Sequence, residues 1–261
     1  MKQKCKILVL SDIDSSTEKI IKNGVNLAKI VDGEINFFCV KKAIDIVEKE
    51  SQLSAMRTIN EKFLEADNKI KKIIKEQSKN EDVKIDYKIS FGNLKNEISK
   101  EIKETNPDII VLGKSKSKVL SFIGDNIISH VLKEYSGTVM IASDNNLLDA
   151  SSDISLGVLD NINTFSNKFA ETIVSYSDKS LTSFCINDDK LNSNNTTDSS
   201  KKIVEFVFEK GDNVIKNISN YLSKSKVNLL FINREGQEIN SVKPDIKSII
   251  KNLDCSLILT T

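Results

Sequence analysis

Short apolar runs alternate with longer amphipathic stretches along this chain, which predicts strands alternating with helices. The run KILVLSD (6–12) contains β-branched residues and ends at polar turn residues, as a buried parallel strand does. Strands are expected at 6–12, 35–40, 83–90, 108–113 and 137–143. Helices are expected from Ser15 to Gly33, at 44–79, from Gly92 to Pro107 and at 126–134. This alternation predicts a parallel sheet with helices on both faces.

The second half of the chain repeats the first. The run ISLGVLD (154–160) matches 6–12, with Asp160 in the place of Asp12. Further matches join 183–186 to 37–40, 202–212 to the strand and glycine around Gly92, 227–233 to 108–113, and 249–261 to 131–143. Five matches in the same order indicate a tandem repeat.

We therefore expect an α/β fold of two tandem doubly wound domains, each a five-stranded parallel sheet with helices on both faces. The expected domain limits are 1–146 and 152–261, with the boundary in the polar stretch between them. The second domain is expected to be shortened, because an Asn/Ser-rich stretch at 187–200 replaces the long helix of the first.

Composition excludes several classes of protein. The 38 Lys and Arg residues balance 37 Asp and Glu residues, so no overall field attracts nucleic acid or an anionic membrane. No run approaches the roughly 20 apolar residues of a membrane span, and the first apolar run is too short for a signal peptide, so a cytoplasmic location is expected. The four cysteines lie far apart in the sequence, which predicts reduced, buried thiols rather than a zinc or redox site.

Three features together resemble the universal stress protein family, and the resemblance covers both halves. They are a first strand that ends in Asp (ILVLSD), a strand DIIVLG before a loop of small residues, and the closing pair HVLKEYSGTVMIAS. The resemblance implies a five-stranded parallel sheet with four helices in each repeat. It also implies pairing through the last strands, which in tandem members joins the two repeats of one chain.

In one branch of that family, ATP binds to a loop of Gly, two residues, Gly, nine residues, Gly, and then Ser or Thr. Glycines let backbone amides approach the phosphates, and the following helix N-terminus favours negative charge. Here Gly113 holds the first position, whereas Lys116, Asp125 and Asn126 hold the other three, in a loop one residue shorter. The resemblance therefore implies an eroded nucleotide site in the first domain.

Two interpretations of this loop stay open. Gly124 lies one position early and could take the glycine role, while Lys114, Lys116 and Lys118 could hold phosphates by charge. Against this, short basic loops are usually only solvated, and the negative charge of Asp125 at a helix start opposes phosphate binding. In the second domain, Asn233 replaces the first glycine, and the sequence predicts no nucleotide site there.

Two further residues belong to this candidate site by resemblance. Asp12 corresponds to a residue that contacts the adenosine end of the ligand, although a turn or cap role explains it equally well. Val40 corresponds to a residue beside the adenine, but a strand end of this kind is more often plain core.

No motif for catalysis is visible in the sequence, so an enzyme is not expected. The single histidine, His130, lies within a predicted helix and is expected to be packed or at the surface. The helix at 44–79 is longer than one sheet face needs, so a homo-oligomer or protein partner is expected through it or through the last strands.

Two functional hypotheses result. The first is a non-catalytic stress-response protein, a pseudo-dimer whose nucleotide site is altered or lost. The alternative is a protein that binds ATP or another adenine nucleotide, or a slow ATPase, through the loop 113–126 with Asp12 and Val40.

Overall fold

The chain divides into two compact units, Met1–Val139 and Met140–Thr261. The computed structural model describes residues 4–14, 16–41, 52–78, 83–114, 125–151, 153–159, 168–187, 202–234 and 246–261. The domain limits expected from the sequence, 1–146 and 152–261, stay a prediction.

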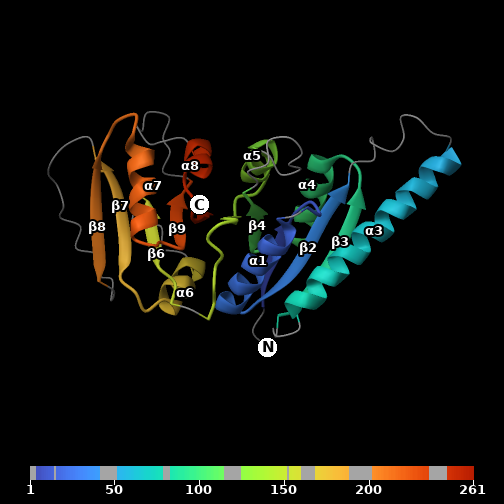
Figure 1. The fold of residues 1–261 in the computed structure, drawn as a ribbon, viewed down its shortest axis with the longest axis horizontal. Helices are drawn as coiled ribbons and strands as arrows, with labels where there is room; N and C mark the ends of the chain where they lie inside the picture. Colours follow the sequence, from blue (N-terminus) through green and yellow to red (C-terminus); the bar gives the residue numbers. More distant parts are fainter. Residues whose placement is uncertain are drawn as a thin grey trace. The chain divides into compact units, whose positions relative to one another are not determined.

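The first unit is a doubly wound α/β fold (Figure 1). Its strands are β1 (Cys5–Leu10), β2 (Gly33–Lys41), β3 (Ile85–Phe91), β4 (Ile109–Gly113) and β5 (Thr138–Ala142), which runs past the unit boundary. Its helices are α1 (Thr17–Val31), α3 (Gln52–Ser78), α4 (Leu94–Thr105) and α5 (Asp125–Glu134). The strands lie in the order β3-β2-β1-β4-β5, and β1 pairs in parallel with both β2 and β4.

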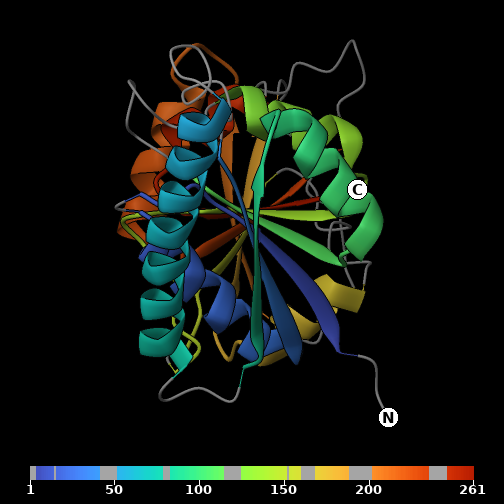
Figure 2. The same cartoon turned by 90° about the vertical axis from the view of Figure 1, so that its right-hand side faces the viewer.

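The helices of this unit cover both faces of the sheet, as predicted. Gly24 of α1 lies against Val9 and Ile35, whereas Glu101 of α4 accepts a hydrogen bond from Asn36. Ile35 and Asn36 are consecutive in β2 and so point to opposite faces. Figure 2 shows α1 and α3 on one side of the strands and α4 and α5 on the other.

Helix α1 begins and ends one residue away from where the sequence places its caps. Ser16 is the N-cap and its side chain makes no capping hydrogen bond, while Ser15 lies outside the described residues. At the other end, the C-cap is Asp32, which adopts the left-handed conformation, whereas the sequence placed the end of the helix at Gly33. Gly33 instead begins β2, where a Cβ atom would lie 2.9 Å from the carbonyl oxygen of Cys5.

The second unit repeats this topology. Its strands are β6 (Leu156–Leu159), β7 (Leu181–Asn187), β8 (Ile203–Glu209), β9 (Leu229–Asn233) and β10 (Ser256–Thr260). Its helices are α6 (Lys168–Tyr176), α7 (Val214–Lys224) and α8 (Ile246–Asn252). The strand order β10-β9-β6-β7-β8 corresponds element by element to β5-β4-β1-β2-β3, with parallel pairing between neighbours. The tandem fold predicted from the sequence is therefore confirmed.

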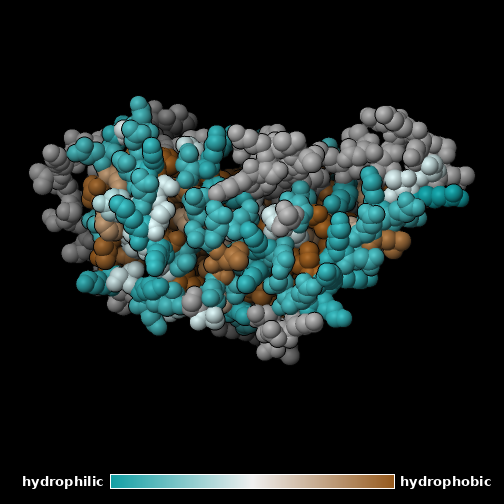
Figure 3. Space-filling view, in the orientation of Figure 1, coloured by the Kyte–Doolittle hydropathy of each residue, from teal (hydrophilic) through white to brown (hydrophobic). Residues whose placement is uncertain are grey.

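Helix α3 covers residues 52–78 of the predicted helix at 44–79, and 44–51 and 79 lie outside the described residues. Ala66 and Ile70 are buried, whereas Met56 is 64% exposed and Leu64 is 57% exposed. Figure 3 shows apolar atoms at the surface along this helix. The helix therefore packs through its second half and leaves apolar side chains exposed in its first. The expected loop at 187–200 is described only at Asn187.

Candidate functional site at the β1/β4 switch point

The strand order of the first unit creates a switch point between β1 and β4. From β1 the chain adds β2 and β3 on one side, and then β4 and β5 on the other. In open α/β sheets, ligands bind beyond the carboxyl ends of the strands at such a point. Pairing of β1 with β4 runs to Leu10 and Leu112, so the residues that follow, Ser11-Asp12 and Gly113-Lys114, flank it.

A hydrogen-bonded turn at residues 11–17 fixes the backbone of Asp12. The hydroxyl of Thr17 donates to the carbonyl oxygen of Asp12 at 2.5 Å and accepts from the backbone N–H of Asp14 at 2.9 Å. The Asp14 carboxylate in turn accepts from the backbone N–H of Ser16 at 2.8 Å. Asp14 and Thr17 therefore both take part in this turn, and the sequence analysis missed Thr17.

The Asp12 carboxylate lies close enough to β2 to affect a thiol there. Burial raises the pKa of Cys39 to about 11, the positive charge of Lys41 opposes this rise, and the negative charge of Asp12 adds to it. Asp12 and Lys41 thus place opposite charges at the carboxyl edge of β1 and β2. Val40 is only 2% exposed, as core packing requires.

Gly113 is in close contact with helix α1. A Cβ atom at this position would lie 2.3 Å from Cδ1 and 2.7 Å from Cγ1 of Ile20, far inside the optimal carbon–carbon separation of about 3.5–4.0 Å. Ile20 is itself buried. Packing of α1 on β4 therefore disfavours a side chain at this position, whether or not a phosphate approaches it.

The rest of the predicted loop is only partly described. Lys114 is half-buried, and Asp125 and Asn126 are the first two residues of α5. Lys116, Lys118 and Gly124 lie outside the described residues. In the second unit, Asn233 ends β9 where Gly113 ends β4.

His130 links two helices of the first unit. Its Nε2 atom lies 2.9 Å from the Ser99 hydroxyl and 3.2 Å from the carbonyl oxygen of Lys95, and the residue is half-buried. The sequence predicted a packed or a surface position, and the structure shows a half-buried one. Among the described residues, no group of His, Cys, Asp and Glu could hold a metal ion, and no helix is long and apolar enough to cross a membrane.

A buried carboxylate on α4 also escaped the sequence analysis. The Glu101 side chain is 3% exposed and accepts hydrogen bonds from Lys88 at 2.5 Å and from Asn36 at 3.2 Å. It looks in the sequence like one of many solvated helix charges. Its position next to Ile102 and three residues after Ile98, both on the buried face of α4, is the signal that could have identified it.

The family model for the universal stress protein family matches residues 5–143. Among solved structures, a universal stress protein from Archaeoglobus fulgidus DSM 4304 is 16% identical, with 98% of this chain and 96% of that chain covered and a TM-score of 0.67. A putative universal stress protein from Pseudomonas aeruginosa UCBPP-PA14 is 9% identical, with 98% and 92% covered and a TM-score of 0.55. No curated protein sequence matches this chain. At these identities, the structural likeness establishes the fold of both units.

Proposed function

The chain belongs to the universal stress protein family, and on that premise we propose a non-catalytic stress-response protein whose first unit carries an eroded adenine-nucleotide site. The eroded site lies at the β1/β4 switch point, between Asp12 and Gly113-Lys114. Pairing of the two repeats within the chain, a cytoplasmic location, and a partner that binds through 44–79 or the last strands belong to the same proposal as predictions from the sequence.

The contact between Gly113 and Ile20 carries this proposal. Gly113 is the single position at which the first domain keeps the family's nucleotide-loop signature. Because a side chain at 113 would overlap Ile20, helix packing alone accounts for this glycine. The one surviving signature residue is therefore no independent sign of phosphate binding, and the sequence expectation that the negative charge of Asp125 opposes a phosphate agrees with this.

One observation favours the alternative, a protein that binds ATP through this site. The turn fixed by Thr17 holds Asp12 at the carboxyl edge of β1, where a ribose-binding carboxylate would be needed, and Lys114 lies across the switch point. Adenosine could be held by Asp12 and Val40 even where the phosphate loop is weakened. Such a site would bind adenosine and ATP with similar affinity, because the phosphates would contribute little.

The two functions are separated by nucleotide content and affinity. Protein purified without added nucleotide is denatured and its supernatant is examined by absorbance and mass spectrometry. ATP with Mg²⁺ and adenosine are then titrated by calorimetry. The proposal expects no co-purified nucleotide and no ATP binding below about 1 mM, whereas one bound ATP per chain would overturn it and establish the alternative.

Two variants locate any binding that is found. Asp12→Asn is expected to weaken adenosine binding about tenfold or more if the switch point is the site, since it removes a charged hydrogen-bond acceptor. Asp212→Asn, at an exposed position in the second unit, is the matched control and is expected to have no effect. Equal affinities of the two variants would place the ligand elsewhere.

A further inference from the structure

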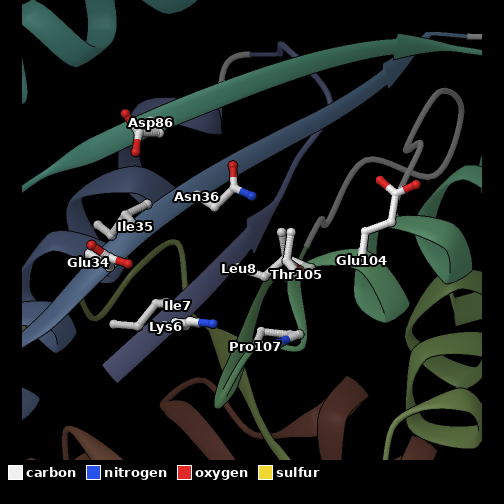
Figure 4. A pocket seen from close by; sticks show the side chains of 10 residues that line it. All are labelled: Lys6, Ile7, Leu8, Glu34, Ile35, Asn36, Asp86, Glu104, Thr105 and Pro107. Carbon is white, nitrogen blue, oxygen red and sulfur yellow. The ribbon is translucent and has the colours of Figure 1, made fainter. Parts of the chain in front are cut away.

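A cavity of about 340 Å³ lies in the first unit at the amino ends of the strands, the opposite end of the sheet from the switch point. Its walls are the first residues of β1, β2 and β3 and the C-terminal end of α4 (Figure 4). Its size is at the small end of the range for ligand pockets, about 300–1,000 Å³. It therefore suits a small metabolite rather than a nucleotide.

The register of three parallel strands determines which side chains enter this cavity. Lys6 of β1 is paired with Glu34 of β2, and Asn36 of β2 is paired with Asp86 of β3. Residues paired across parallel strands, and residues two apart in one strand, point to the same face. This face is the one that α4 covers, since Asn36 donates to Glu101 of α4. Leu8 and Pro107 add apolar surface to the lining.

The lining contains both engaged and available charges. Asp86 pairs with Lys84 at 2.7 Å, and Glu104 pairs with Lys88 at 3.2 Å. Within the part of the chain that the structure describes, the Lys6 ammonium and the Glu34 carboxylate have no hydrogen bond or ion pair, although both residues are half-buried. Figure 4 shows the Lys6 amine directed toward Pro107, with the Glu34 carboxylate on the other side of that lysine. These two groups thus make no direct polar contact among the described residues, although the Glu34 charge acts on the Lys84 ammonium, and they point away from each other.

Asn36 adds an acceptor whose identity is fixed by chemistry. Its Nδ2 donates to the buried Glu101 carboxylate, which can only accept when ionised, so Nδ2 and Oδ1 are not interchangeable. The Oδ1 atom is therefore the acceptor that Asn36 can offer to a ligand, beside the second N–H of Nδ2. Together with Glu34, it gives the β2 side of the cavity two acceptors, opposite the single donor on β1.

We propose that this cavity binds a small zwitterion of the α-amino-acid class. Its carboxylate would pair with the Lys6 ammonium, its ammonium would bind Glu34 and Asn36, and an apolar side chain would lie against Leu8 and Pro107. A simple amine would be repelled by Lys6, and a simple carboxylate would be repelled by Glu34. This inference does not depend on nucleotide binding.

Three compounds that share one isobutyl group test the proposal on the full chain. They are L-leucine, 3-methylbutylamine, which lacks the carboxylate, and 4-methylpentanoate, which lacks the ammonium. Binding is followed by the amide chemical shifts of Lys6, Glu34 and Thr105 in ¹⁵N-labelled protein. Leucine is expected to bind at least about tenfold more tightly than either fragment, since each fragment loses one charge-assisted contact.

Two variants connect the ligand groups to the side chains. Lys6→Met is expected to remove the advantage of leucine over the amine, and Glu34→Gln its advantage over the acid. Lys22→Met on α1 and Glu171→Gln on α6, both exposed, are the matched controls and should leave all three affinities unchanged. Circular dichroism and the urea midpoint establish that each variant is folded.

Three outcomes would overturn the proposal. The first is no shift of these amides with leucine at about 10 mM, which is weaker than a site of this class should bind. The second is a fragment that binds as tightly as leucine, which would make the cavity a simple cation or anion site. The third is leucine binding that neither variant changes, which would place the ligand elsewhere on the protein.

Discussion

Replacing Gly113 by alanine tests whether this glycine serves the packing of α1 on β4. The new Cβ atom would lie 2.3 Å from Cδ1 of Ile20, an overlap of more than 1 Å with the optimal carbon–carbon distance of about 3.5–4.0 Å. Ile20 is buried, so it cannot turn into solvent. Overpacking of this kind costs about 1–3 kcal/mol, and we expect Gly113→Ala to lower the free energy of unfolding by that amount.

A second substitution shows where the cost arises. Ile20→Val removes Cδ1, the nearer of the two overlapping atoms, and alone costs about 0.5–1.5 kcal/mol. In the double variant the two changes should compensate, so its loss of unfolding free energy should be smaller than the sum of the two single losses by at least about 0.5 kcal/mol. Gly211→Ala is the control, because no atom lies within 4 Å of its Cβ position, and its effect should stay within about 0.5 kcal/mol.

Urea unfolding followed by far-ultraviolet circular dichroism measures these effects. The two units can unfold in separate transitions, so each curve is fitted with as many transitions as it shows, and midpoints are compared at equal slopes. The reasoning is refuted if Gly113→Ala is as stable as the parent protein. It is also refuted if the two changes are additive, because the cost would then not come from Ile20.

Two further predictions follow from pKa shifts. Hydrogen bonds from Lys71 and Tyr87 lower the pKa of Asp67, so they stabilise the fold above the ordinary pKa of the carboxyl and cease to do so as pH falls through the lowered value. Between about pH 5 and 2, the urea midpoint should therefore fall less steeply with pH in Tyr87→Phe than in the parent protein. Parallel curves for the two proteins would contradict this. Burial raises the pKa of Cys39 to about 11 and that of Cys5 to about 12. At about pH 8, a disulfide reagent should therefore label both thiols far more slowly in the native protein than in urea. Mass spectrometry of the labelled peptides measures the two rates, and equal rates would contradict the prediction.

The sequence predicted the strands well where a strand is buried on both faces. Strands β1, β4 and β9 each contain four consecutive apolar residues, at 7–10, 109–112 and 229–232, because a parallel sheet covered by helices needs apolar side chains on both sides. Their order along the chain, repeated in the second half, was enough to predict two doubly wound units. The limits of α1 were less predictable. Asp32, not Gly33, adopts the left-handed conformation at the end of the helix, and Gly33 lies in β2, where its backbone closely approaches β1.

The candidate site was predictable in part for the same reason. Asp12 follows one apolar strand and Gly113 ends another. The carboxyl ends of parallel strands meet at one edge, so the proximity of these two residues could be expected from the sequence. The contact of Gly113 with Ile20 could not, because it depends on how α1 lies on β4. The role of Thr17 was also hidden, since its hydroxyl acts only after the turn at residues 11–17 has formed.

The sequence by itself determined the class of fold, the repeat and the family resemblance, because the apolar pattern and short motifs are local properties of the chain. Only the tertiary structure decided that Lys6 lies beside Glu34 at one end of a cavity and that Glu101 is buried against Asn36 and Lys88. The register between strands and the packing of helices bring these residues together. The pattern of residues within one segment does not determine which residues of another segment lie beside it.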